Sequence, residues 1–137
     1  IPGSKELIQK ILKKSSAYTG ATGLALPLAA AGISSIQHLI SNPGLITGIQ
    51  EKSLKLKKRF IDIGFDMPMS PSPVFSVTFY NEEKNLVLRR KLLDNGIYPP
   101  FINYPGAPRG GHFRFIITSE TSEDQINLLF ETVKSAI

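Results

Sequence analysis

The sequence lacks cysteine and is poor in histidine. Its 137 residues include no cysteine and two histidines, His38 and His112. The absence of cysteine excludes disulfides, thiolate zinc sites and a cysteine nucleophile, and it is typical of proteins of the reducing cytoplasm, so we expect a cytoplasmic protein. Both histidines are isolated, so we expect no metal site and little capacity for acid–base catalysis.

The signatures of several enzyme classes are also missing. No Ser–His–Asp set and no Walker-type phosphate loop can be drawn from these residues. Glu82 and Glu83 stand where a helix is expected to begin, rather than as a catalytic carboxylate pair. Taken alone, the chain is more like a module that supplies a binding group than a complete catalyst.

Long apolar runs are missing too. The longest stretch of low charge, Ala17–Ser41, is interrupted by Pro27, Gln37 and His38. A membrane-spanning helix needs about 20 predominantly apolar residues, so we expect no membrane span. No signal peptide is visible, and residues 1–4 lack an initiator Met and look like a chain already under way, which predicts a piece of a longer protein.

Positive charge, in contrast, is in excess. The formal net charge is +5, and many lysines fall in two runs, at residues 10–14 and 52–59. Such runs can contact nucleic acid or an anionic membrane. No aromatic residues interleave with the lysines and no nucleic-acid motif is present, so we interpret the runs as solvated helix faces and expect no nucleic-acid partner. A non-catalytic basic binding module stays open as an alternative.

The hydrophobic periodicity predicts three helices, then strand, helix, two strands and a final helix. The helices are expected at about 4–16, 27–40, 45–63 and 81–95 and from Thr121 or Ser122 onward, and the strands at 74–80, 97–104 and 112–118. The expected N-caps are Ser4, Asn81 and Thr121 or Ser122, the last with a capping box, and Gly64 is the expected stop of the third helix. The composition, 42% hydrophobic and 20% charged, is that of a globular domain. This order predicts an α+β fold with a small, mainly antiparallel three-stranded sheet covered by helices.

The spacing of apolar residues predicts which side chains each helix buries. In the second helix these are Ile33, Ile36, Leu39 and Ile40, with His38 partly buried beside them. In the helix at 81–95 they are Leu86, Val87, Leu92 and Leu93, and in the last helix Ile126, Leu129, Phe130 and Val133. The uncharged stretch Tyr18–Pro27 is predicted not to be helical.

The strand at 112–118 holds the candidate binding residue. Strand side chains alternate, so His112, Arg114 and Ile116 are expected on one face, opposite Phe113, Phe115 and Ile117. A guanidinium can hold a carboxylate through two parallel hydrogen bonds, and Gly110 and Gly111 just before it would let a ligand approach the backbone. The alternative is a structural salt bridge from Arg114 to a neighbouring helix.

The segment from Tyr104-Pro105 through Gly110–Ile126 resembles the C-terminal signature of α-oxoamine synthases. These are fold-type I enzymes that depend on pyridoxal 5'-phosphate, such as 8-amino-7-oxononanoate synthase, glycine C-acetyltransferase and serine palmitoyltransferase. The second arginine of the family's R-x-R pattern falls on Arg114, which implies that Arg114 binds the carboxylate of the amino-acid substrate. The first arginine is His112 here, and the family's histidine after the strand is Thr121, so the resemblance leaves the substrate open.

Two upstream segments are similar to the same family. Gly3–Ile8 resembles the segment soon after the Schiff-base lysine, which implies that this lysine and the pyridoxal-binding large domain lie upstream. Gly20–Pro27 resembles a segment whose hydroxyl residue reaches the cofactor phosphate in the other subunit of a homodimer. Thr22 matches that residue, although its spacing alone also fits an ordinary loop. Residues 1–27 would then link from the large domain, and 28–137 would form the C-terminal small domain.

The resemblance therefore implies a transferase fragment. The parent would condense an amino acid with an acyl-CoA and release carbon dioxide, and pyridoxal phosphate would be its cofactor. This chain alone is expected to be inactive, with no covalently bound cofactor, because no lysine matches the family's S-x-x-K element. A class I/II aminotransferase or a lyase of the same fold is the alternative within the class.

Overall fold

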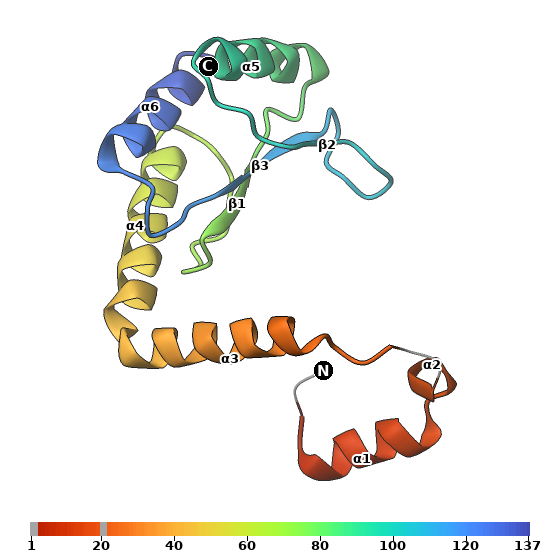
Figure 1. Cartoon of the computed structure of the whole chain (residues 1–137). Helices are drawn as coiled ribbons and strands as arrows, with labels where there is room; N and C mark the ends of the chain where they lie inside the picture. Colours follow the sequence, from red (N-terminus) through yellow and green to blue (C-terminus); the bar gives the residue numbers. More distant parts are fainter. Residues whose placement is uncertain (1–2, 20–21) are drawn as a thin grey trace. The chain divides into compact units, whose positions relative to one another are not determined.

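The computed structural model describes residues 3–19 and 22–137. The chain divides into two compact units, Ile1–Ser41 and Asn42–Ile137. Among the described residues, every strand belongs to the second unit (Figure 1).

The first unit contains helices α1 (Lys5–Lys14), α2 (Ser16–Thr19) and α3 (Leu26–Ser41). The Ser4 hydroxyl accepts a hydrogen bond from the Leu7 N–H at 3.2 Å, which confirms the predicted N-cap of α1. Tyr18 and Thr19 lie in α2 and Leu26 lies in α3, so the prediction that the stretch Tyr18–Pro27 is not helical is wrong at both ends. Gly20 and Ala21 of that stretch lie outside the described residues, and 22–25 have no regular structure.

Helix α3 begins with Pro27 in its first turn, as predicted, but its apolar side chains are not buried. Exposed fractions range from 43% to 74% for the predicted stripe Ile33, Ile36, Leu39 and Ile40. His38, predicted to be partly buried, is exposed as well. Periodicity identifies the face that a helix can bury, but not which element covers it, and none of the described residues buries this face.

The second unit contains helix α4 (Pro43–Asp62), strand β1 (Val74–Val77), helix α5 (Glu82–Asp94), strands β2 (Phe101–Ile102) and β3 (His112–Ile116), and helix α6 (Glu123–Lys134). The predicted order of elements is confirmed. The strands are shorter than predicted, and the second shrinks to two residues because Pro99 and Pro100, just before it, cannot donate to a ladder.

The sheet is three-stranded and antiparallel, with the order β1-β3-β2, so the prediction of a small antiparallel sheet is confirmed. β3 is the central strand, with Ser76 opposite Arg114 and Phe101 opposite Phe113. In Figure 1 the helices α4, α5 and α6 gather on one side of this sheet. The described residues leave the other face of β1 and β3 open, where Ser76, Arg114 and Ile116 are exposed.

The core lies between the sheet and these helices. It is rich in phenylalanine: Phe60 of α4 contacts the rings of Phe65, Phe75 and Phe130 at centroid separations of 5.5–5.8 Å. Arg59 places its guanidinium 3.9 Å from the centre of the Phe130 ring and ties α4 to α6. The predicted buried face of α6 is confirmed, with Leu129 only half-buried.

Of the four side chains that helix α5 was predicted to bury, the structure buries Leu92 alone. Leu88 and Leu92 are fully buried, but Leu86, Val87 and Leu93 are 41–55% exposed. The buried row also contains Asn85, three residues before Leu88. Because Asn85 is polar, the spacing of apolar residues alone does not identify this row as the buried one.

The helix ends follow the local sequence. Asn81 caps α5, and Ser122 forms a capping box with Gln125 at the start of α6, as predicted. Gly64, at a φ of +99°, ends α4, because its N–H donates to the Ile61 carbonyl and the next N–H donates to the Phe60 carbonyl. These ends fix where the segments that carry the site begin.

Candidate functional site

Arg114 lies on the open face of the central strand. Its neighbours Phe113 and Phe115 are buried on the other face, which confirms the predicted alternation and anchors the strand. The Arg114 N–H donates to the Pro100 carbonyl at 3.1 Å. The exposed guanidinium makes no hydrogen bond or ion pair with any residue that the structure describes. It is therefore available to an anion from outside the described chain.

The two glycines before the strand lie close to neighbouring residues. A Cβ on Gly111 would lie 2.9 Å from the Ile102 carbonyl oxygen, and one on Gly110 would lie 2.9 Å from the Glu82 nitrogen. Both residues have positive φ, at +79° and +72° for Gly110 and Gly111. Gly111 is buried, so the expectation that a ligand approaches the backbone is wrong at Gly111. Gly110 is half-buried and borders a pocket, so the expectation stays a prediction there.

A buried asparagine holds this glycine turn in place. The Asn85 Nδ2 donates to the carbonyls of Gly110 (2.8 Å) and Gly111 (3.2 Å), and its Oδ1 accepts from the Phe79 N–H at 3.1 Å. The Thr78 hydroxyl donates to the same Gly111 carbonyl at 2.7 Å. Asn85 thus connects α5, the end of β1 and the start of β3. The sequence analysis missed it; its spacing from Leu88 and Leu92 is the signal that could have found it.

Lys57 also departs from its predicted role on a solvated helix face. Its side chain is 1% exposed, and its ammonium donates to the carbonyls of Ser70 (2.9 Å) and Ser72 (2.7 Å). Burial lowers the pKa of Lys57 below its ordinary value of 10.5. The lysine pins the proline-rich segment before β1 to α4. The prediction of a solvated face is wrong at this position, while Lys55 and Lys58 are exposed.

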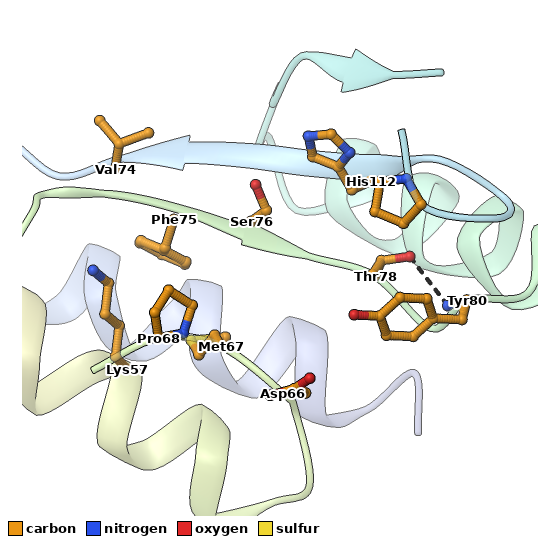
Figure 2. Close-up of a pocket in the computed structure, with 11 residues that line it drawn as sticks. Lys57, Asp66, Met67, Pro68, Val74, Phe75, Ser76, Thr78, Tyr80 and His112 are labelled. Carbon is orange, nitrogen blue, oxygen red and sulfur yellow. Dashed lines mark hydrogen bonds between the residues drawn. The ribbon is translucent and has the colours of Figure 1, made fainter. Parts of the chain in front are cut away.

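A pocket of about 280 Å³ borders the outer side of β1. Figure 2 shows Ser76 and His112 on one side of this strand and Phe75, Met67 and Pro68 on the other. The His112 ring is half-buried, and its Nδ1 is buried without a hydrogen-bond partner in the described part of the chain. Such a nitrogen needs an explanation, because an unpaired buried polar atom is unfavourable.

Thr22 belongs to the first unit. It lies in the irregular segment between α2 and α3, and its side chain is exposed. No hydrogen bond of its hydroxyl is recorded with the described residues. The structure thus leaves this hydroxyl accessible, as a contact to a phosphate requires.

Two expected absences concern the described residues 3–19 and 22–137. They contain no cluster of three or more His, Asp or Glu side chains positioned to bind a metal ion. They also include no helix whose length and apolar character would suffice to span a membrane.

Comparison with known proteins shows which family and which relatives this chain is similar to. The model of the family "Aminotransferase class I and II" matches residues 1–133. The 8-amino-7-oxononanoate synthase 1 of Bacillus velezensis is 27% identical over 135 residues, which are 98% of this chain and 34% of that protein. The 8-amino-7-oxononanoate synthase of Symbiobacterium thermophilum is 29% identical over 126 residues, which are 90% and 32%. The chain thus spans about a third of the length of these relatives, and it matches their C-terminal portion.

Solved structures agree on the fold. The serine palmitoyltransferase of Sphingomonas wittichii superposes with a TM-score of 0.80 at 19% identity over 96% of this chain and 34% of that one. The 8-amino-7-oxononanoate synthase of Francisella tularensis gives a TM-score of 0.79 at 18% identity over 96% and 39%. The predicted fold, that of the C-terminal part of such synthases, is confirmed.

Proposed function

Because the chain belongs to the aminotransferase class I and II family, we propose that it is part of an α-oxoamine synthase-like enzyme in which Arg114 holds the carboxylate of the amino-acid substrate. The observation that carries this proposal is the exposed guanidinium on the central strand of the sheet, which has no partner among the described residues. A planar guanidinium fixes both the position and the orientation of a carboxylate. The names of the relatives favour a synthase over an aminotransferase.

In the proposed reaction, the bond between Cα and the carboxylate carbon breaks and carbon dioxide leaves. A bond forms between Cα and the carbonyl carbon of an acyl thioester, and the thiol is released. Pyridoxal 5'-phosphate, when bound in the parent enzyme, supplies the electron sink for chemistry at Cα. The contribution of Arg114 is to bind the carboxylate and to orient the bond that breaks.

The described residues fit the substrate carboxylate better than they fit the cofactor. A lysine that forms an imine must offer a free amine, but Lys57, which borders the pocket, uses its ammonium to hold two carbonyls. No lysine of the chain lies in the family's S-x-x-K element either, so we assign the lysine that would hold the cofactor to the parent enzyme. Thr22 would contact the cofactor phosphate of the partner subunit in a homodimer, a role that its exposure allows.

Substitution of Arg114 in the full-length parent enzyme tests the proposal. We expect Arg114→Ala to raise KM for the amino acid by about 100-fold, since a charge-assisted bidentate pair contributes about 3 kcal/mol. Arg114→Lys should recover little of this loss, because an ammonium cannot form two parallel bonds. The matched control is Arg90→Ala at an exposed position of α5, which should leave KM unchanged. An unchanged KM in Arg114→Ala would rule out the carboxylate role.

A further inference from the structure

A groove lies between helix α5 and strand β2, at one edge of the sheet. The strand order β1-β3-β2 leaves the outer side of β2 without a neighbouring strand in the described part of the chain (Figure 1). The groove has a volume of about 370 Å³, and its apolar lining consists of Leu93, Tyr98, Pro99, Phe101 and Phe113. Phe113 is buried, whereas Leu93, Tyr98 and Phe101 are exposed. Large apolar side chains that stay exposed around one groove are typical of a binding site.

The free edge of β2 has a backbone donor and a backbone acceptor. Phe101 lies opposite Phe113, and the hydrogen bond from the Arg114 N–H to the Pro100 carbonyl makes these two residues a non-hydrogen-bonded pair of the ladder. The N–H and C=O of Phe101 therefore point away from β3, and neither has a backbone partner among the described residues. Pro99, the preceding residue on this edge, has no N–H, so pairing with a further strand would begin at Phe101.

The one charged side chain that lines the groove in the described part of the chain is a cation. Arg89 of α5 is exposed and makes no ion pair with the residues that the structure describes. None of the described residues that line the groove is a carboxylate. The groove therefore favours a ligand that carries a carboxylate beside an apolar group, because a guanidinium binds a carboxylate through charge-assisted hydrogen bonds.

We propose that this groove binds an extended acidic segment of a partner protein, which pairs with Phe101 as an additional strand of the sheet. In this mode of recognition the backbone of the segment bonds to the free edge, and its alternate side chains determine which sequence binds. A segment fits better than a small molecule, because the free N–H and C=O of Phe101 match the spacing of another strand.

The position of the Phe101 ring indicates which side chains the segment presents. The ring lies 4.9 Å from that of buried Phe113, centre to centre, on the face of the sheet that the helices cover. The residue of the segment opposite Phe101 therefore points into the groove, where an apolar side chain contacts Leu93 and Tyr98. Residues two positions away share this face, so an acidic residue there is directed toward Arg89.

Binding of a synthetic peptide to the 137-residue chain tests this site. The probe is acetyl-Thr-Glu-Thr-Val-Thr-Glu-Thr-amide, whose sequence is the same in both directions, so valine lies between two glutamates of the same face whichever way the strand runs. In a ¹H–¹⁵N NMR titration we expect saturable shifts at the backbone amides of Tyr98 and Phe101. Methylation of the valine nitrogen removes the donor to the Phe101 carbonyl and should weaken the affinity about fivefold. The absence of saturable shifts at these amides, or an equal affinity of the methylated peptide, would overturn the proposal.

Substitution of Arg89 tests the preference for a carboxylate. A second peptide carries glutamine in place of both glutamates, and we expect it to bind the wild type about tenfold more weakly. In Arg89→Ala this difference should disappear. Arg90→Ala is the matched control: Arg90 is the next residue, is exposed and does not line the groove, so the tenfold difference should persist. If Arg89→Ala keeps the difference, the proposal is wrong.

Arg114 separates this proposal from the proposed function. Its side chain lies on the face of β3 opposite to Phe113, so Arg114→Ala should leave the affinity for the peptide unchanged. A loss in Arg114→Ala as large as that in Arg89→Ala would overturn the groove as the binding site. An unchanged KM for the amino acid in Arg114→Ala would instead contradict only the carboxylate role.

A second copy of the chain is the alternative occupant of the free edge. Pairing of two β2 strands would shift the Phe101 amide when the chain is diluted without peptide. We expect this amide to stay at one position over a hundredfold range of protein concentration. A shift on dilution that the peptide does not suppress would assign the groove to self-association and overturn the proposal.

Discussion

At the scale of single residues, Lys57 and Arg114 are two cationic side chains of the second unit, one buried and the other exposed. Lys57 is buried, and its ammonium is hydrogen-bonded to two carbonyl oxygens. Arg114 is exposed and has no side-chain partner among the described residues. A protein rarely buries an ammonium without satisfying it, whereas an unpaired surface guanidinium can still bind an anion. The first cation therefore has a structural role, and the second is the candidate for function.

The lowered pKa of Lys57 predicts how its contribution to stability changes with pH. In the folded protein Lys57 loses its proton at a lower pH than in the unfolded chain, whose value is near 10.5. Between these two pKa values the unfolded chain binds more protons, so the free energy of unfolding rises with pH in this window. Lys57→Met lacks this titrating group. We therefore expect the unfolding free energy of the wild type, minus that of Lys57→Met, to increase as the pH approaches 10.5.

Urea denaturation of both proteins at a series of pH values up to this limit measures the difference. Lys58→Met is the matched control, because Lys58 is exposed and pairs only with Asp62, one turn away. For this variant the difference from the wild type should not grow with pH. A flat profile for Lys57→Met would show that Lys57 titrates alike in the folded and unfolded states.

Sequence reasoning at this scale succeeds for Arg114 and fails for Lys57. The alternation of polar and aromatic residues around Arg114 is local, so it predicts the exposed face correctly. The burial of Lys57 depends on the carbonyls of Ser70 and Ser72, more than ten residues away, as their separations of 13 and 15 residues show. Nothing in the lysine run itself predicts those contacts.

At the scale of elements, the position of the candidate strand depends on α5. Asn85 contacts the end of β1 and the glycine turn before β3, while Leu88 and Leu92 pack into the core. Gly111 is packed against Ile102, so this turn has little room to shift. The helix thus determines where β3 begins, and through β3 where Arg114 lies.

We therefore expect Asn85→Ala to destabilise the protein by about 3 kcal/mol, because the Phe79 N–H and the Gly110 carbonyl would lose a buried partner. Asn95→Ala is the matched control at the end of the same helix. The Asn95 side chain is exposed and, among the described residues, hydrogen-bonds only to the Lys91 carbonyl, so its loss should change stability by no more than about 0.5 kcal/mol. Chemical denaturation gives both values. Similar values for the two variants would refute the role assigned to Asn85.

The elements themselves were largely predictable, because their boundaries are set by nearby residues. The caps Ser4, Asn81 and Ser122 and the stop at Gly64 lie where the sequence predicts them. The inward faces were less predictable. α5 turns Asn85 into the core, and α3 has an apolar stripe that the described residues leave exposed. Both faces depend on tertiary contacts that a periodic pattern does not contain.

At the scale of the whole molecule, the hydrophobic core belongs to one of the two units. Among the described residues, all the buried apolar side chains, from Leu56 to Val133, lie in Asn42–Ile137, and helices α1 and α3 bury none. Cooperative stability derives mainly from apolar burial. The stability of the second unit should therefore not depend on the first.

We expect residues 42–137 alone to fold and to unfold in one cooperative transition. Their melting temperature should lie within about 5 °C of that of the full chain, which corresponds to less than about 1 kcal/mol for a domain of this size. Circular dichroism and calorimetry of both polypeptides measure this. Residues 42–121 serve as the control: they lack α6 and with it Ile126, Phe130 and Val133, so the core cannot form and no cooperative transition should appear. If residues 42–137 are unfolded while the full chain is folded, the first unit contributes stability that its exposed side chains do not explain.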